Sequence, residues 1–137
     1  MSESKIKHLE FIQGVVNRLS TNSFLLKGWS VVLVAALLGL GSQDEQERLV
    51  FLALLPVVVL WGLDGYFLWQ ERLYRHLYDF VRQKDAAEID FSMNPAPVIG
   101  HDSGWIAATF SKTLIAFHGV LIIAIGVVTY FVLDGGN

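Results

Sequence analysis

Apolar residues are gathered in three long blocks along the chain, with polar segments between them. The blocks cover residues 22–41, 49–68 and 112–133, and each reaches the roughly 20 residues that an α-helix needs to cross a bilayer. This pattern predicts an all-α membrane protein with three transmembrane helices. The polar turn around residues 41–48 is short, so the first two spans should be antiparallel neighbours.

The segment before the first block, residues 3–20, has helical periodicity. Its apolar positions lie three or four residues apart and are Ile6, Leu9, Ile12, Val16 and Leu19. Such spacing places one apolar stripe on an otherwise polar helix. We expect an amphipathic N-terminal helix that lies on the membrane face or against another helix.

The second block is expected to extend well beyond the membrane. Pro56 lies inside it, where neighbouring helices can satisfy the carbonyl group that a proline frees. No glycine or proline follows its last apolar residues until after Lys84. Residues 69–84 should therefore continue the helix as a stalk, and residues 85–104, with two prolines and two glycines, should form an ordered loop on the same side. The whole chain, 1–137, is expected to be a single membrane domain.

The positive charges indicate which way round the chain sits. Nine of the ten lysines and arginines flank or open the first span or lie between the second and third spans, and only Arg48 lies in the short turn. Positive loops stay in the cytoplasm. The pattern predicts a multi-pass protein of the bacterial inner membrane whose N-terminus, stalk and long loop are cytoplasmic and whose C-terminus is periplasmic.

One carboxylate lies inside an apolar block, at Asp64 in the sequence WGLDGYF. Reflection of the first two spans about their short turn brings Asp64 close to the depth of Lys27, and His118 of the third span reaches a similar depth. Because a charge in lipid costs about 2.5 to 3.5 kcal/mol, Asp64 should pair with Lys27. The resulting polar layer has three interpretations: an ion pair that locks the helices in register, a layer that lines or gates a water-filled path, and, with the least support, a catalytic group.

The stalk carries a second group of candidate residues. Positive side chains can neutralise phosphates, and aromatic rings can stack on bases. The same residues also fit a cluster that touches anionic lipid beside the membrane. The candidates for binding a polyanion are Arg72, Arg75, Tyr78, Arg82 and Lys84.

Enzymatic chemistry has little support in the sequence. The chain has no cysteine, no HExxH or GxSxG motif and no phosphate-binding glycine loop, and its four histidines are too sparse for a metal site. We expect no catalytic residues, no metal and no cofactor. A membrane-bound enzyme that uses His101 and Asp102 is the weakest alternative.

Two stretches carry a resemblance to a known group of proteins. Residues 22–29 read NSFLLKGW, and residues 61–64, WGLD, are followed by QERL at 70–73. These motifs resemble those of small bacterial membrane effectors of anti-phage defence, of the Hailong type. The match runs from the N-terminal region through the stalk, whereas the loop and the last span are generic. The resemblance implies an oligomeric channel paired with a nucleotidyltransferase-type protein and held shut by an oligonucleotide until infection releases it.

Two functional hypotheses follow. The first is a homo-oligomeric, regulated pore; three helices enclose no lumen, so conduction needs several copies, a tetramer or larger. The second is a non-conducting membrane anchor or adaptor that recruits a cytoplasmic partner through the stalk and the 85–104 loop.

Overall fold

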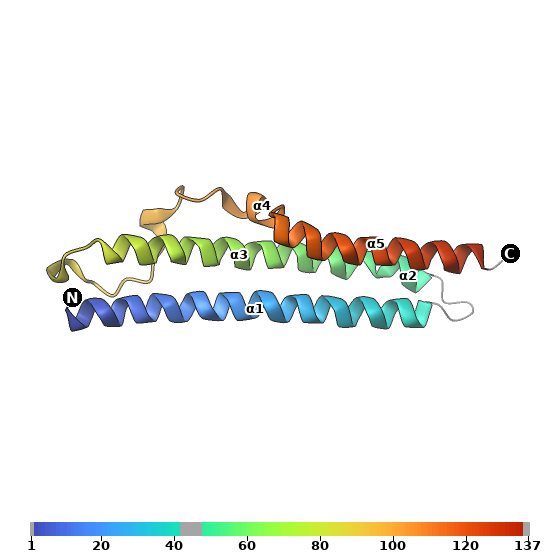
Figure 1. Ribbon diagram of the computed structural model, residues 1–137, viewed down its shortest axis with the longest axis horizontal. Coiled ribbons are helices and arrows are strands. Elements are labelled where there is room, and N and C mark those ends of the chain that lie inside the picture. Colours follow the sequence, from blue (N-terminus) through green and yellow to red (C-terminus); the bar gives the residue numbers. More distant parts are fainter. Residues whose placement is uncertain (1, 42–47, 136–137) are drawn as a thin grey trace.

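The computed structural model describes residues 2–41 and 48–135, and within them the chain is helical without a β-strand. The α-helices are α1 (Glu3–Gly41), α2 (Arg48–Leu52), α3 (Leu54–Arg82), α4 (Gly104–Thr109) and α5 (Lys112–Asp134), and two 3₁₀ turns lie at Ala86–Glu88 and Ala96–Val98. α1 and α3 lie side by side over most of their length, and α5 runs alongside them at one end (Figure 1).

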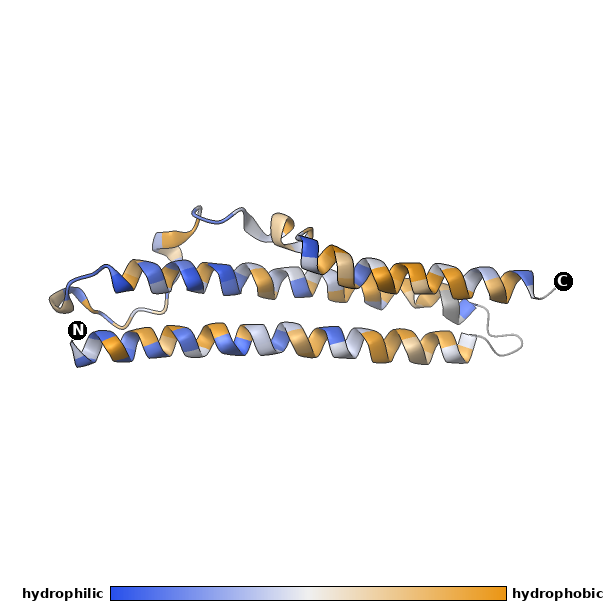
Figure 2. Ribbon diagram, viewed as in Figure 1, coloured by the Kyte–Doolittle hydropathy of each residue, from blue (hydrophilic) through white to orange (hydrophobic). Residues whose placement is uncertain are grey.

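The molecule has two halves of different polarity. Figure 2 shows apolar residues concentrated where α5 lies beside the C-terminal part of α1 and the start of α3, and polar residues concentrated around the N-terminus and the end of α3. We call these the apolar half and the polar half. The segment that joins α3 to α4, residues 83–103, folds back along the polar half and is called the strap.

The N-terminal segment is not a separate amphipathic helix. α1 is one continuous helix of 39 residues that includes both residues 3–20 and the first apolar block. Its apolar stripe at Leu9, Ile12 and Val16 is buried, and the first two pack against Leu77 and Val81 of the stalk. Of the two expected settings for this segment, the structure has the one against another helix, and that packing continues the helix without a break.

The second apolar block is interrupted near its start. α2 ends at Leu52, Ala53 forms a turn, and α3 begins at Leu54. Proline lacks an N–H group, and its ring clashes with the carbonyl group four residues earlier. For Pro56 that carbonyl belongs to Leu52, the last residue of α2, so the expected unbroken helix is divided there. Beyond the break, α3 runs through the stalk to Arg82, as the sequence predicts, over about 44 Å at ~1.5 Å per residue.

Two described helices, α1 and α5, are long and apolar enough to cross a membrane. Only 17% of the residues in the apolar stretch of each are buried, so most of their apolar side chains face outward. The expected second span, formed by α2 and the start of α3, is divided at Ala53 and continues into the polar stalk, and it is not among these two helices.

Each half has its own apolar core. In the apolar half, Val34 of α1, Ala53, Val57 of α3 and Ile125 of α5 are buried together. In the polar half, the core of α1 and stalk residues also contains Val98 of the strap. Asp64 lies on α3 between these two cores, with Val57 on one side and Leu73 on the other.

The strap is ordered and hydrogen-bonded to the helices. Lys5 Nζ of α1 donates to the carbonyl of Lys84 at 2.7 Å, and the Tyr74 hydroxyl donates to the carbonyl of Met93 at 3.0 Å. At its end, the Asp102 carboxylate accepts the Gly104 N–H at 3.2 Å. The helix that follows is broken at residues 110–111, so α4 and α5 are separate elements.

Candidate functional site

The centre of the candidate site is the carboxylate of Asp64, which is fully buried. Its Oδ2 atom lies 2.7 Å from Lys27 Nζ and 2.9 Å from His118 Nε2. Its Oδ1 atom accepts a hydrogen bond of 2.5 Å from Ser23 Oγ. We call Ser23, Lys27, Asp64 and His118 the polar junction, because they join α1, α3 and α5.

The helices explain why these side chains meet. Ser23 and Lys27 lie one turn apart on the same face of α1, and Lys27 Nζ also donates to Ser23 Oγ at 2.8 Å. The sequence predicted that Lys27, Asp64 and His118 lie at one depth, and the structure brings these three together. Ser23 was missed, although its place four residues before Lys27 in NSFLLKGW was a usable signal.

His118 is held on its edge and on its face. An ionised carboxylate can only accept hydrogen bonds, so Nε2 carries the proton that is donated to Asp64. The imidazole ring stacks on the Trp61 indole at a centroid distance of 5.6 Å and an angle of 10°. The Nδ1 atom is buried without a hydrogen-bond partner among the described residues. The Phe117 ring meets the imidazole edge-on at 5.0 Å. His118 is therefore held by one hydrogen bond and two aromatic contacts.

The junction pairs one positive and one negative side chain, and these two side chains are not equally buried. Asp64 is fully buried, whereas the Lys27 side chain is 18% exposed and lies 5.9 Å from the centroid of the Phe117 ring. Removal of one partner of a buried ion pair costs about 3 to 5 kcal/mol, because the other charge is left uncompensated. The junction can thus hold three helices together, and its partly exposed members, Lys27 and Ser23, are the ones through which it meets its surroundings.

α4 is clamped to α3 beside the junction. The Trp61 indole N–H donates to the Thr109 carbonyl at 2.7 Å, and the Trp105 indole N–H donates to the Gly62 carbonyl at 2.9 Å. A Cβ atom at Gly65 would lie 2.7 Å from Thr109 Cα, so only glycine permits this approach. Trp61, Trp105 and Tyr66 thus gather at the level of the junction.

The candidate residues of the stalk do not form one site. Arg75 pairs with Glu71 at 2.8 Å, as its spacing predicts, Arg82 lies 3.5 Å from Asp79, and Lys84 lies 3.9 Å from Asp90. Tyr78 and Arg82 line one cleft, and Lys84 lines another. Much of the positive charge expected on the stalk is therefore matched by its own acids. The role of the five residues in binding a polyanion stays a prediction.

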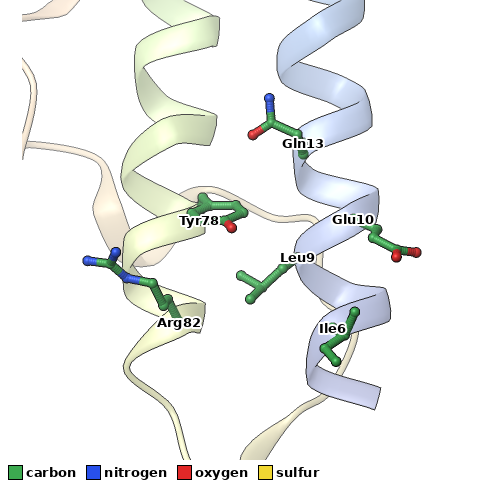
Figure 3. A pocket seen from close by; sticks show the side chains of 6 residues that line it. All are labelled: Ile6, Leu9, Glu10, Gln13, Tyr78 and Arg82. Atoms are coloured by element: carbon green, nitrogen blue, oxygen red, sulfur yellow. The ribbon is translucent and has the colours of Figure 1, made fainter. Parts of the chain in front are cut away.

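The cleft that contains Tyr78 and Arg82 lies between α1 and the end of α3 and has a volume of about 280 Å³. Figure 3 shows Leu9 and Tyr78 reaching into the space between the helices, with Gln13 above them, while Glu10 points away. The cleft is lined by apolar side chains, the Tyr78 ring, the Gln13 amide and the oppositely charged side chains of Glu10 and Arg82. The ring of Tyr78 suits stacking with a planar ligand, and Arg82 can pair with a negative charge on it.

A second buried histidine, His8, was not among the sequence candidates. Its Nε2 donates to the carbonyl of Ser92 in the strap at 2.9 Å, and its Nδ1 has no partner among the described residues. Phe91, with φ +55°, lies with its ring 5.6 Å from the His8 ring. A positive φ is rare for phenylalanine. We call the His8, Phe91 and Ser92 contact the clasp, because it fixes the strap to α1.

The histidine and acid of the strap do not act together. His101 Nδ1 lies 3.2 Å from the Val98 carbonyl, whereas Asp102 Oδ1 lies 3.8 Å from His76 Nε2. Across residues 2–41 and 48–135 no group of three or more histidine, aspartate or glutamate side chains is placed to hold a metal ion.

Comparison of the chain with protein-family models, curated proteins and solved structures finds no match.

Proposed function

We propose that the protein is a homo-oligomeric, regulated pore of the bacterial inner membrane that acts as an effector of anti-phage defence. Its three spans are α1, α2 with the first part of α3, and α5, and its polar half is cytoplasmic. The observation that carries the proposal is the buried network of the polar junction, which joins all three spans. Intramembrane ionisable groups mark ion and proton routes in membrane proteins.

The depth of the junction supports this proposal. Measured back from Gly41, α1 extends about 21 Å to Lys27 and about 27 Å to Ser23 at ~1.5 Å per residue. A hydrocarbon core about 30 Å thick would therefore contain the whole junction close to its inner edge. A buried ion pair is often no more stabilising than well-packed apolar residues of similar size, so a role in gating supplies a reason for ionisable groups at this depth.

Conduction in this proposal depends on several copies. One chain provides three spans, which leave no room for a lumen, and the partly exposed Lys27 places the edge of the junction at the outer surface of the single chain. In an oligomer of four or more subunits, that edge would face the lumen or the neighbouring subunit. Opening then involves separation of Lys27 from Asp64 or movement of both.

Gating through the cytoplasmic face is proposed to involve an oligonucleotide. The resemblance at residues 22–29 and 61–73 favours this ligand and a nucleotidyltransferase-type partner. The cleft between α1 and the stalk adds a ring at Tyr78 for a base and a guanidinium at Arg82 for a phosphate. A bound phosphate would compete with Asp79 for Arg82, since these side chains lie 3.5 Å apart.

The alternative of a non-conducting anchor or adaptor is favoured by one observation. Three of the four stalk cations proposed for the ligand are within 4 Å of acids of the same chain, which leaves a surface of mixed charge. Such a surface suits a protein partner better than a polyanion.

The experiment is a flux measurement on the purified full chain in vesicles of phosphatidylethanolamine and phosphatidylglycerol. The decay of an imposed K⁺ diffusion potential reports conduction. A pore accelerates this decay, and Asp64→Asn changes the rate by at least about tenfold, because it removes the charge that holds Lys27 and His118. Ser30→Ala is the matched control. Among the described residues the buried Ser30 side chain bonds only to the Leu26 carbonyl of its own helix, so the decay rate of this variant should equal that of the wild type.

Two results would refute the pore. One is a wild-type decay rate equal to that of empty vesicles, with and without added mixed-sequence oligonucleotide. The other is a monomer or dimer as the assembled state, because it cannot enclose a lumen. A soluble partner that copurifies and is lost on deletion of residues 85–103 would instead support the adaptor.

A further inference from the structure

α4 exposes large apolar side chains that the rest of the chain leaves uncovered. Ile106 is 75% exposed, Phe110, which follows the helix, is 59% exposed, and Trp105 is 48% exposed. Its opposite side packs against α3 through Ala108, which is fully buried. The helix therefore has one face on the protein and one apolar face directed outward.

The position of α4 identifies what covers this face. α4 is attached to α3 at Gly62 and Gly65, and Gly62 lies about 21 Å from Arg48 at ~1.5 Å per residue. A hydrocarbon core of about 30 Å that begins near Arg48 extends past this level. α4 also leads directly into α5, whose apolar surface is exposed at Ile115 and Val120. The outward face of α4 thus continues the surface that α5 presents to lipid.

The polar atoms of α4 are compatible with that depth. An indole N–H placed in hydrocarbon needs a hydrogen-bond acceptor. Trp105 donates to the Gly62 carbonyl, and Trp61 donates to the Thr109 carbonyl. The Thr109 hydroxyl donates to the Trp105 carbonyl at 2.9 Å. These bonds satisfy the side-chain donors of α4 within the protein.

α4 also contacts the ring that supports the polar junction. Trp61 makes two contacts with this segment. Its indole N–H donates to the Thr109 carbonyl, and its ring packs edge-on against the ring of Phe110, the residue after α4, at a centroid distance of 5.8 Å. The other contact of the Trp61 ring is the stacked imidazole of His118, which holds Asp64. A shift of α4 therefore moves Trp61 relative to His118.

We propose that α4 is an interfacial helix seated in the inner-leaflet lipid through Ile106, Phe110 and Trp105, and that it transmits changes in that leaflet to the polar junction through Trp61. This inference rests on the proposed function for its membrane setting. It adds a partner, the acyl-chain boundary of the inner leaflet, and a form of regulation, in which lipid packing biases the junction.

The contact of α4 with lipid is tested with spin labels. Because the chain has no cysteine, each single-cysteine variant can be labelled at one defined position. Ile106→Cys and Ile99→Cys are matched, because both isoleucines are exposed, at 75% and 60%. Ile99 follows Val98, which belongs to the same core cluster as Leu77. Leu77 lies about 22 Å along α3 from Gly62, so residue 99 is far from the level of α4. In the same vesicles, a nitroxide at residue 106 should collide mainly with oxygen, and one at residue 99 mainly with a water-soluble nickel chelate.

The outcomes separate the two proposals. If the chain resists carbonate extraction from the vesicles but the label at residue 106 is as accessible to nickel as that at residue 99, the inference is wrong and the membrane assignment stands. If carbonate removes the chain from the vesicles, both are wrong.

The transmission step is tested by adding lysophosphatidylcholine to the leaflet on the side of the polar half. The K⁺ decay rate of each variant is compared with its own rate before addition. The wild-type ratio should change at least about fivefold, within the range of coupling between sites. Trp61→Phe keeps an aromatic ring but removes the bond to Thr109, and its ratio should approach one. An unchanged wild-type ratio in a conducting protein, or an equal ratio in Trp61→Phe, would overturn the transmission.

Discussion

The two buried histidines invite comparison, because each fixes a junction between elements far apart in the sequence. His118 and His8 both donate from Nε2 and both leave Nδ1 without a partner among the described residues. They differ in the acceptor. His118 meets the carboxylate of Asp64 between helices, whereas His8 meets the backbone carbonyl of Ser92 in the strap.

Because the acceptors differ, the polar junction and the clasp should differ in strength. A charge-assisted hydrogen bond is about twice as strong as a neutral one, and the Asp64 carboxylate also holds Lys27 and Ser23. The polar junction is thus a network in which every member depends on Asp64. The clasp consists of one neutral hydrogen bond and the Phe91 contact. We expect the clasp to open far more readily than the junction.

The largest expected effect is the loss of the shared carboxylate. Asp64→Leu should lower the free energy of unfolding by about 3 to 5 kcal/mol, since Lys27 is left as an uncompensated charge. Thermal unfolding in detergent, followed by circular dichroism, measures it. Asp79→Leu is the control, because Asp79 is an exposed acid of the same helix and its loss should change stability by about 0.5 kcal/mol or less.

The double variant Lys27→Met/Asp64→Leu tests whether the cost comes from the unpaired charge. Because an apolar pair of similar volume can replace a buried ion pair without loss, the double variant should recover most of the stability lost in Asp64→Leu. If it is no more stable than the single variant, charge pairing does not explain the junction.

The second prediction concerns the support of His118 by α4. Gly65→Ala should destabilise the protein by about 2 kcal/mol, as overpacking does, because the added Cβ meets the backbone of Thr109. Gly62→Ala lies one turn away on the same helix and meets nothing within 4 Å. It should match or exceed the wild type in stability, since alanine favours helix. Hydrogen exchange should show faster opening of α4 in Gly65→Ala and an unchanged clasp, and equal stability of the two variants would contradict the close contact.

The third prediction compares the two histidines directly. Glutamine retains an N–H donor in place of Nε2, but its side chain packs less well than the imidazole ring. His118→Gln should lower stability by about 2 kcal/mol and His8→Gln by about 1 kcal/mol. Without the ring contacts the amide N–H is held less firmly, and a weakened hydrogen bond to a charged group costs more than a weakened neutral one. Chemical denaturation measures both. Amides 89–98 should exchange faster only in His8→Gln, and a greater loss in His8→Gln than in His118→Gln would reverse the comparison.

The smallest effect concerns pH at the strap. The Ser92 backbone N–H donates to the Asp90 carboxylate at 3.1 Å and, with nearby Lys84, holds the pKa of Asp90 below its ordinary value of 3.8. A carboxyl group with a lowered pKa stabilises the folded state above its ordinary pKa, and this contribution is lost as pH falls through the lowered value. The protection factors of the strap amides, which correct for the intrinsic pH dependence of exchange, should therefore fall in strongly acidic solution, and less so in Asp90→Asn, which keeps the acceptor but does not titrate. If the wild type and Asp90→Asn respond identically to acid, ionisation of Asp90 does not stabilise the strap.

The sequence was informative for features that depend only on position along the helices. Depth along antiparallel helices depends only on residue number and a short turn, so the shared level of Lys27, Asp64 and His118 could be predicted. The stalk followed from the absence of stop signals. The break at Ala53 was missed because the clash of Pro56 with the Leu52 carbonyl was judged tolerable in a bundle.

Other features depend on contacts that no periodicity encodes. The bond between His8 and Ser92 joins residues 84 positions apart, and its loop partner is a backbone carbonyl, which any residue could supply. The seat of α4 depends on Gly65 facing Thr109, and a glycine in an apolar block does not reveal its neighbour. The pairing of Arg82 with Asp79, by contrast, was visible at a spacing of three residues and was overlooked.

The continuity of α1 has a mechanical consequence. A helix of 39 residues is about 58 Å long at ~1.5 Å per residue, and it enters both cores as well as the layer between them without a hinge. Such a rod does not absorb a displacement at one end by local bending. A tilt of only about 5° would move its far tip by about 5 Å over that length, so events at the N-terminal end would reach the opposite face of the molecule as rigid-body rotation.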